Sequence, residues 1–390
     1  MAKLILKRGR ANPLWHGHPW VYSGAILREE GGYEPGDSVE VSDFEGRPIG
    51  RGLANPRSQI RVRMMTWRDE PIDAALIAAR VREARALRER LGFPSEATTA
   101  YRLINSEGDG LPGLTVDVYG DVHAVQFSAL GLKRREDEVY DALAQLQPRA
   151  IVEVSAGGFA QVEGFASATR VVRGPDDLAS VRCRENGIEL EVEPLKGQKT
   201  GMFLDQRDNR RRVGELSRGA RVLDVYTYAG GFALNALKGG AVHATCVDSS
   251  ARALERVQAH AALNGLTNVE TVEADAFRYL ETARPRSYDF VIVDPPKFAR
   301  ARKDLDAAIK GYQRLNTLAM TACAEGGLLA TSSCSQLVDE ETFERMLAAA
   351  AKDAGRRVQV LEVRSQGADH PIPPAFPEGR YLKFLLCRLV

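Results

Sequence analysis

The sequence predicts an α/β protein whose C-terminal half, residues 196–390, folds as a doubly wound parallel sheet. In that half, near-continuous apolar runs alternate with segments of helical spacing, which is typical of parallel strands joined by crossover helices. Residues 1–70 differ, because glycines and prolines recur there between short alternating runs, the pattern of a β-rich domain. A chain of 390 residues is also too long for one core, which indicates two or three domains.

The region between these parts, residues 71–180, is mixed. It opens with a stretch rich in Ala, Arg and Glu (71–91) that predicts a helix stopped by Gly92. Alternating residues then flank Asn186-Gly187, the strongest short signal for a β-hairpin. We therefore take residues 181–195 as a hairpin linker. An exposed strand edge in the mixed region could pair two chains into a homodimer.

Seven strands are expected in the C-terminal half, at residues 220–226, 242–248, 268–274, 288–294, 327–333, 357–364 and 381–389. Leu305, Ala308 and Tyr312 begin a repeat of three and four residues that predicts a helix before Gly326. The last two strands are joined by residues 367–379, which hold four prolines. Because this link is too short for a crossover helix, we expect an antiparallel final pair.

The composition predicts a soluble, cytoplasmic protein. Its formal net charge of +1 means that any nucleic-acid contact must come from local patches. Five scattered cysteines form no Cys-x-x-Cys pair and no His/Cys metal spacing, which favours reduced thiols and no metal site. The chain is charged again soon after its start and has no run of about 20 apolar residues, so we expect neither a signal peptide nor a membrane span.

A glycine turn follows the first of these strands. The stretch from Asp224 to Phe232 has neither G-x-G-x-x-G nor a Walker sequence, so it predicts no cradle for a pyrophosphate or triphosphate. Instead Asp224, Tyr226 and Gly230 would face a ligand that approaches the backbone, with no basic residue nearby. This pattern suits a ligand with a cationic centre and no phosphates, such as S-adenosylmethionine.

Acidic residues end the next two strands as well. Asp248 lies 24 residues after Asp224, where an acid is placed for ribose hydroxyls. Asp275, beside Phe277, could accept from the adenine amino group. Each acid alone is more often a helix cap or a solvated strand end. Three acids at three successive strand ends favour the adenosyl cofactor.

A thiol and a carboxylate are expected side by side at the carboxyl edge of the sheet, where open α/β sheets bind ligands. Asp294 ends one apolar run, and Cys334 ends the strand expected beside it. Methylation of carbon 5 of a pyrimidine needs a thiolate that first adds to carbon 6. Cys334 is placed for this step, amid serines and close to Lys297. The other four cysteines are expected to be packing residues: Cys183, Cys246, Cys323 and Cys387.

Asp294 makes cytosine the preferred base. A protonated Asp294 could donate to N3 of cytosine, whereas N3 of uracil carries its own hydrogen. The group that removes the carbon-5 proton stays open between water and a second group near Lys297. Two alternatives remain: a guanine nitrogen methyltransferase, in which Cys334 is structural, and a non-catalytic RNA-binding assembly module. The second conflicts with the intact acidic strand ends.

A second surface should hold the nucleic acid, because a base in RNA is reachable only when unstacked or flipped. The best candidates are Arg61 and Arg63 on the polar face of a strand, together with the N-terminal set Lys7, Arg8, Arg10, Trp15, His16 and His18. Singly, each is more often a solvated charge. His370 lies near the target base or is merely a turn residue, and the sequence favours neither.

Six motifs together resemble the bacterial ribosomal RNA large subunit methyltransferase I family. They are residues 107–113, 197–210, 224–232, 294–298 (Asp-Pro-Pro-Lys-Phe), 333–335 (Ser-Cys-Ser) and 368–371 with 377–383. The similarity covers nearly the whole chain. It implies an N-terminal PUA domain, a small α+β central domain, and a C-terminal Rossmann-like class I methyltransferase domain that uses S-adenosylmethionine.

The resemblance also implies formation of 5-methylcytosine in 23S rRNA, as naked RNA or in a partly assembled large subunit. By position, Cys334 is the nucleophile and Phe298 of the fourth motif lies with the substrate-binding residues. Asp205, Gln206 and Arg207 face the cofactor. Many RNA cytosine-5 methyltransferases carry a second cysteine that assists product release, and here Pro296 takes its place.

Overall fold

The computed structural model describes residues 1–175, 178–196, 200–299 and 301–390. The chain forms two compact units. The N-terminal unit comprises Met1–Arg184, Glu191–Leu204 and Ala368–Gly379, and the C-terminal unit comprises Glu185–Leu190, Asp205–Gly367 and Arg380–Val390. Residues 197–199 of the motif at 197–210 lie outside the described residues. The domain boundaries at residues 70, 180 and 195 stay a prediction.

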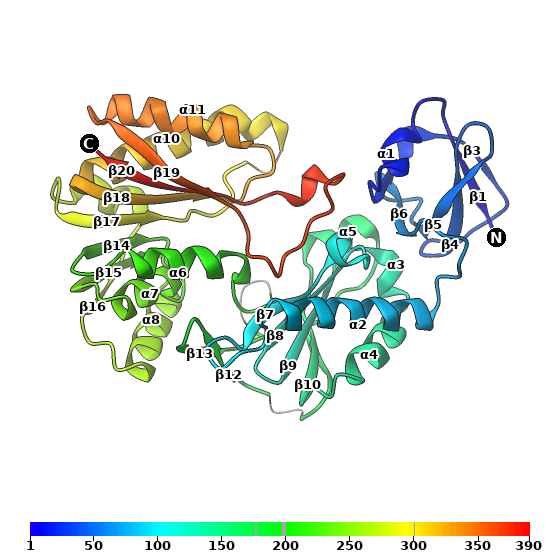
Figure 1. Ribbon diagram of the computed structural model, residues 1–390, viewed down its shortest axis with the longest axis horizontal. Helices are drawn as coiled ribbons and strands as arrows, with labels where there is room; N and C mark the ends of the chain where they lie inside the picture. The colour runs from blue at the N-terminus through cyan, green and yellow to red at the C-terminus, as the bar shows by residue number, and fades with distance from the viewer. Residues whose placement is uncertain (176–177, 197–199, 300) are drawn as a thin grey trace. The chain divides into compact units, whose positions relative to one another are not determined.

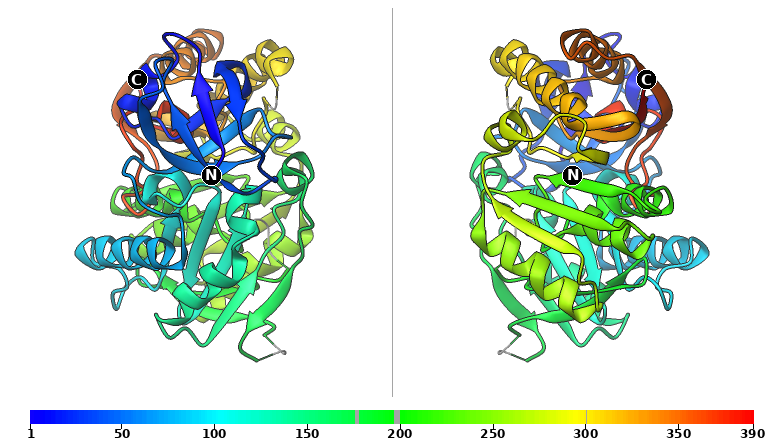
Figure 2. Two further views of the ribbon diagram at one scale, coloured as in Figure 1. Left: turned by 90° about the vertical axis from the view of Figure 1, so that its right-hand side faces the viewer. Right: turned by 90° about the vertical axis from the view of Figure 1, so that its left-hand side faces the viewer.

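The first sheet of the N-terminal unit has six strands in the order β2-β6-β5-β4-β1-β3 (Figure 2, left, blue). The elements are β1 (Lys3–Leu6), α1 (Asn12–Trp15), β2 (Trp20–Tyr22), η1 (Ser23–Ala25), β3 (Ile26–Glu30), β4 (Ser38–Ser42), β5 (Pro48–Ala54) and β6 (Ile60–Thr66). In β6, Val62 and Met64 are buried in the core of this sheet. The alternation at residues 60–64 thus predicted a strand correctly, and the β-rich N-terminal part is confirmed.

The second sheet of this unit has five strands in the order β11-β10-β9-β8-β7. Its elements are α2 (Ala74–Arg90), β7 (Ala100–Asn105), η2 (Ser106–Asp109), β8 (Leu114–Tyr119), β9 (Val122–Phe127), α3 (Leu130–Lys133), α4 (Glu136–Ala144), β10 (Ala150–Glu153), α5 (Gly158–Glu163) and β11 (Arg170–Arg173). Helix α2 begins after Asp73, whose side chain accepts from the Leu76 amide. The helix expected at 71–91 is confirmed. Strand β11 lies at an edge, and its pairing into a homodimer stays a prediction.

The hairpin is also confirmed. It consists of β12 (Val181–Glu185) and β13 (Ile188–Val192). Asn186 and Gly187 both have positive φ, at 54° and 74°, as a two-residue hairpin turn of type I′ requires. The Asn186 side chain donates to the Arg207 carbonyl at 3.1 Å, so this turn also supports the segment that follows it.

The C-terminal unit is built on a seven-stranded sheet in the order β16-β15-β14-β17-β18-β20-β19. The strands are β14 (Arg221–Val225), β15 (His243–Asp248), β16 (Val269–Glu273), β17 (Tyr288–Val293), β18 (Cys323–Ser333), β19 (Val358–Arg364) and β20 (Lys383–Leu389). All seven expected strands are present, and β14 to β18 pair in parallel. The antiparallel final pair is confirmed, with β20 inserted between β18 and β19.

Helices cover both faces of this sheet (Figure 1). They are η3 (Leu204–Gln206), α6 (Arg207–Glu215), α7 (Gly231–Lys238), α8 (Ala251–Leu263), α9 (Ala276–Thr282), η4 (Arg302–Asp304), α10 (Leu305–Ala322) and α11 (Glu340–Asp353). A last short helix, η5 (Pro377–Gly379), belongs to the N-terminal unit. Leu223 and Val225 of β14 pack with α9, α10 and α11, whereas Val222 packs with α6, α7 and α8. This alternation confirms the doubly wound α/β sheet.

The four cysteines expected to be packing residues are buried: Cys183, Cys246, Cys323 and Cys387. The last three belong to the two cores of the C-terminal sheet. Within the described ranges, none of the helices is long and apolar enough to cross a membrane.

Candidate active site

Two parallel neighbours, β17 and β18, bring the Asp-Pro-Pro and Ser-Cys-Ser motifs to one edge of the sheet. Val293 pairs with Thr331, so Asp294 follows its strand beside Ser332. The Ser332 hydroxyl donates to Asp294 Oδ1, and Gln206 Nε2 donates to the same oxygen at 3.1 Å. Cys334 lies two residues after Ser332 in the sequence. The expected juxtaposition of the two strand ends is therefore present.

Burial and several nearby side chains shift the pKa of the Asp294 carboxyl. Burial raises its pKa, and the nearby Asp205 carboxylate acts in the same direction. The hydrogen bond from Ser332 and the charge of Arg210 oppose this shift. Because Oδ1 already accepts two hydrogen bonds, a proton on this carboxyl belongs on Oδ2. A protonated Asp294 could therefore donate to a ring nitrogen.

Cys334 is half-buried, in contrast to the four packing cysteines. Its neighbours are tied to other elements: Ser333 Oγ donates to the Tyr312 hydroxyl at 3.0 Å, and Lys383 Nζ donates to the Ser335 carbonyl at 2.5 Å. Lys297 is exposed. The thiol thus lies in a segment that β20 and α10 hold from two sides.

Phe298 packs in a row of aromatic rings. Its ring centroid lies 4.6 Å from that of Tyr312 and 6.5 Å from that of Phe277. The ring is half-buried, because part of its surface packs against Tyr312 of α10. Contact between Phe298 and a substrate base stays a prediction.

The loop between β14 and α7 has an unusual backbone. Tyr226, Tyr228 and Gly230 all have positive φ, at 62°, 51° and 82°. Asp224 holds this loop, because its Oδ2 accepts from Thr227 Oγ1 at 2.7 Å and from the Ala233 amide at 3.1 Å. Asp224 Oδ1 is buried and has no hydrogen-bond partner among the described residues. Burial raises the pKa of Asp224 to about 7.

The other two acids at strand ends also hold backbone groups. Asp248 accepts from the amides of Tyr228 and Ser250, each at 3.0 Å. Asp275 caps helix α9 by accepting from the Arg278 amide at 3.1 Å, and it is exposed. Each carboxylate keeps acceptor capacity for a ligand. Their roles toward ribose and adenine stay predictions.

The segment Asp205–Arg207 opens helix α6. Asp205 Oδ2 accepts from the Tyr381 hydroxyl at 2.6 Å. Gln206, which donates to Asp294, accepts through Oε1 from Asn209 at 2.7 Å. The Arg207 guanidinium is buried, with its Nε 3.3 Å from Asp208. Gln206 thus links the segment that the resemblance assigned to the cofactor directly to the Asp-Pro-Pro motif.

These residues fit S-adenosylmethionine. A Cβ on Gly230 would lie 3.2 Å from Val257, and one on Gly231 would lie 2.7 Å from the Arg210 side chain, so the turn depends on its glycines. Asp248 and Asp275 place acceptors at successive strand ends beside it. Carboxylate oxygens can accept hydrogen bonds from the hydroxyls and the amine of this ligand, and their charge favours its sulfonium. The glycines let the ligand approach the backbone.

The predicted RNA-binding arginines are ion-paired in the N-terminal unit. Arg63 contacts Glu107 at 3.1 Å and Glu163 at 3.3 Å, with only 14% of its side chain exposed. Arg61 lies 3.5 Å from Glu29. These contacts support the fold of the unit. RNA contact by either residue stays a prediction. In the N-terminal set, Lys7, Arg8, Arg10, Trp15 and His16 are exposed, and His18 is half-buried.

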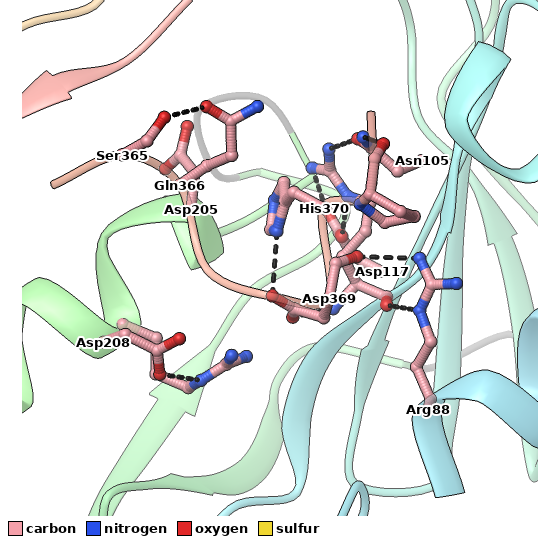
Figure 3. Close-up of polar contacts among 12 residues, drawn as sticks. Arg88, Asn105, Asp117, Asp205, Asp208, Ser365, Gln366, Asp369 and His370 are labelled. Atoms are coloured by element: carbon pink, nitrogen blue, oxygen red, sulfur yellow. Dashed lines mark hydrogen bonds and ion pairs between the residues drawn. The ribbon is translucent and has the colours of Figure 1, made fainter. Parts of the chain in front are cut away.

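His370 is also in the N-terminal unit. Its Nδ1 lies 2.9 Å from Asp369 Oδ1, and the Arg88 guanidinium of α2 donates to the Asp369 carbonyl at 2.7 Å (Figure 3). The imidazole is buried, and its Nε2 has no partner among the described residues. The imidazole is therefore packed inside this unit against Asp369, and contact of His370 with a base stays a prediction.

Sequence reasoning missed three residues around the thiol and the carboxylate: Ser332, Tyr312 and Lys383. Ser332 and Tyr312 carried no separate signal, since one is a strand residue and the other fits a helical apolar repeat. Lys383 did carry one, because it opens a strand that is apolar except for Arg388. A charged residue at the start of a buried strand needs a specific partner.

Two family models match different parts of this chain. The PUA-like domain model matches residues 4–67, and the model of an S-adenosylmethionine-dependent methyltransferase matches residues 164–361. The protein from Aeromonas salmonicida named ribosomal RNA large subunit methyltransferase I is 40% identical over 391 residues, covering 99% of this chain and 98% of that protein. The protein of the same name from Shewanella denitrificans is 41% identical, covering 99% of both.

Solved structures show the same fold. The methyltransferase SMU.776, complexed with S-adenosylhomocysteine, superposes with a TM-score of 0.87. An S-adenosylmethionine-dependent methyltransferase from Streptococcus mutans gives 0.86. Both are 23% identical to this chain, and the match covers 100% of each chain.

Proposed function

Because this chain belongs to the ribosomal RNA large subunit methyltransferase I family, we propose that it methylates carbon 5 of a cytosine in 23S rRNA through a covalent adduct with Cys334. The family membership makes it an S-adenosylmethionine-dependent rRNA methyltransferase with a PUA-like domain. The observation that carries the finer proposal is that Asp294 and Cys334 follow the ends of two adjacent parallel strands, where Ser332 hydrogen-bonds to Asp294.

In the proposed reaction, the Cys334 thiolate adds to carbon 6 of the cytosine and forms an S–C6 bond. A protonated Asp294 Oδ2 donates to N3, so that the electron pair displaced from the C5–C6 bond makes carbon 5 nucleophilic. The raised pKa of Asp294 supports this role. S-adenosylmethionine supplies the electrophilic methyl group. Carbon 5 would take this methyl group and S-adenosylhomocysteine would leave. Loss of the carbon-5 proton, to water or to a second group near Lys297, then expels the Cys334 sulfur. The N3 proton returns to Asp294 as the aromatic ring is restored.

The substrate would be held by the N-terminal unit as well. Its PUA-like domain exposes Arg8, Arg10 and the ring of Trp15, and cations together with an exposed aromatic ring suit RNA. The choice between naked 23S rRNA and a partly assembled subunit belongs to the same proposal and is tested by using each as substrate.

A trap experiment tests the covalent step. RNA transcribed with 5-fluorocytidine cannot lose a proton from carbon 5, so the adduct should persist through denaturing electrophoresis. We expect a protein–RNA band with the wild type, and mass spectrometry should place the crosslink on Cys334. The Cys334→Ala variant should give no band.

The main alternative is methylation of a guanine nitrogen, which requires no thiol. It predicts no trapped band and a methylated guanine in digests of the product RNA. That combination would replace the cytosine proposal.

A further inference from the structure

A buried lysine lies beside the proposed nucleophile. Lys383 opens β20, a strand whose residues are buried at every position except Arg388. Only 6% of Lys383 is exposed. It pairs in register with Ser333 on the antiparallel neighbour β18, so it stands across from the start of the Ser-Cys-Ser segment.

The Lys383 ammonium is held by backbone carbonyls. Nζ donates to the Ser335 carbonyl at 2.5 Å and to the Tyr381 carbonyl at 2.8 Å. An ammonium has three N–H donors, and these two carbonyls take two of them. The residue between Ser333 and Ser335 is Cys334.

Charged and titratable side chains of several neighbouring elements surround Lys383 and Cys334. The Cys334 thiol interacts electrostatically with Lys383 of β20 and Tyr312 of α10. Lys383 also interacts with Asp339, which precedes α11, and with Lys297, which follows β17. Asp294 acts on Tyr312 from the end of β17. Burial lowers the pKa of Lys383 to about 8, while Cys334 and Asp339 oppose that shift.

We propose that Lys383 is a positioning residue that holds Cys334 as a thiolate and fixes the Ser-Cys-Ser segment against β20. The Lys383 ammonium attracts the thiolate, so the Cys334 sulfur releases its proton to solvent at a lower pH than a free thiol would. Lys383 keeps its own proton, and its two hydrogen bonds to carbonyls are kept. The use of this thiolate in catalysis rests on the proposed function, but its ionisation can be measured without RNA.

The test is the pH dependence of Cys334 alkylation by iodoacetamide, followed by mass spectrometry of its peptide from pH 5.5 to 10. Only the thiolate reacts. We expect a wild-type midpoint clearly below the ordinary thiol pKa of about 8.5. Lys383→Met, which keeps the buried volume without the charge, should raise the midpoint by about one unit and slow alkylation at pH 7 about ten-fold.

Two further variants sharpen the result. Lys383→Arg keeps a cation and should restore part of the shift. Lys310→Met removes an exposed lysine of α10 and should leave the midpoint unchanged. An unchanged midpoint in folded Lys383→Met would overturn the proposal. If that variant does not fold, a wild-type midpoint at or above about 8.5 overturns it equally.

The outcome is separable from the proposed function. If wild-type protein makes no 5-methylcytosine but shows the lysine-dependent thiol shift, the reaction assignment fails and this inference stands. If 5-methylcytosine forms while the Lys383→Met midpoint is unchanged, the reaction stands and Lys383 is only a packing residue.

Discussion

The Ser332 hydroxyl donates to the Asp294 carboxylate across the ends of two parallel strands. This hydrogen bond favours the ionised carboxylate, whereas burial favours the neutral acid. The protonation state of Asp294 therefore depends on a balance between two structural features, and substitutions can shift it in either direction.

Cys334→Ala should reduce methyl transfer by at least about 10³-fold, because carbon 5 of cytosine is too weak a nucleophile without a thiolate adduct. The measurement is transfer of labelled methyl from S-adenosylmethionine to rRNA. Cys387→Ala is the matched control, since Cys387 is a buried packing residue of β20. Equal rates for Cys334→Ala and wild type would eliminate the covalent mechanism.

Ser332→Ala should move the alkaline limb of the rate–pH profile upward. Removing this hydrogen bond destabilises the Asp294 carboxylate, so the pKa of Asp294 rises and the acid that donates to N3 persists to higher pH. Asp294→Asn should lower the rate by about 10²-fold or more and abolish that limb. The profile is measured from single-turnover rates. A limb that stays in place in both variants would show that Asp294 does not titrate in the reaction.

Asp224→Asn should change how stability depends on pH. The pKa of Asp224 is raised to about 7 in the folded protein, above its unfolded value of about 3.9. The folded state therefore binds the extra proton between these values, and wild-type stability falls as pH rises through them, by up to about 1.4 kcal/mol per pH unit. Asparagine removes this dependence.

The Asp224 effect is best followed by hydrogen exchange of the β14 amides, because all three tryptophans, Trp15, Trp20 and Trp67, lie in the N-terminal unit. We expect the wild type to lose protection relative to the variant between pH 5 and pH 7. A difference that is independent of pH would contradict the assigned burial effect.

Glu185→Gln should destabilise the C-terminal unit by about 3–5 kcal/mol. Glu185 accepts two hydrogen bonds of 2.7 Å from Arg210, and both side chains are buried. The substitution removes the carboxylate that accepts both of these hydrogen bonds from the buried Arg210 charge. Glu341→Gln breaks a pair of which both side chains are mostly exposed and should cost less than about 1 kcal/mol. Hydrogen exchange of the C-terminal unit measures both variants. If Glu185→Gln and Glu341→Gln lose similar amounts of protection, the buried Glu185–Arg210 pair does not have this effect.

Gly230→Ala should weaken S-adenosylhomocysteine binding about ten-fold or more, a loss of about 1.4 kcal/mol or more. The new Cβ would press on Val257 at 3.2 Å, at a φ of +82°. Gly265→Ala is the control, because it has a φ of +64° with no atom near its Cβ. Calorimetric titration measures both. If Gly230→Ala and the wild type bind S-adenosylhomocysteine with equal affinity, the cofactor does not bind at this turn.

Much of this architecture could be predicted because it depends on local pattern. The apolar runs predicted the strands. Because parallel strands share a carboxyl edge, Asp294 and Cys334 were expected at neighbouring strand ends. The link from 367 to 379 predicted the antiparallel pair by its length alone. These inferences need only periodicity and topology.

The partners of charged side chains could not be predicted in the same way. Arg63 looked like a solvated strand residue, yet it meets Glu107 and Glu163 from distant parts of the chain. Lys383 was visible as a charge in an apolar strand, but its acceptors depend on the turn after β18 and on Tyr381. Such contacts follow from how non-local segments pack.

The insertion of β20 between β18 and β19 has a consequence for biogenesis. The ribosome synthesises β20 (residues 383–389) after β18 and β19, the two strands that it separates. In a nascent chain, neither β18 nor β19 can pair with β20 until these residues emerge. Until then β18 keeps an open row of amides and carbonyls, and Cys334 lacks the lysine opposite its neighbour. The interaction proposed between Lys383 and the Cys334 thiol can therefore form only after β20 has emerged and paired with β18.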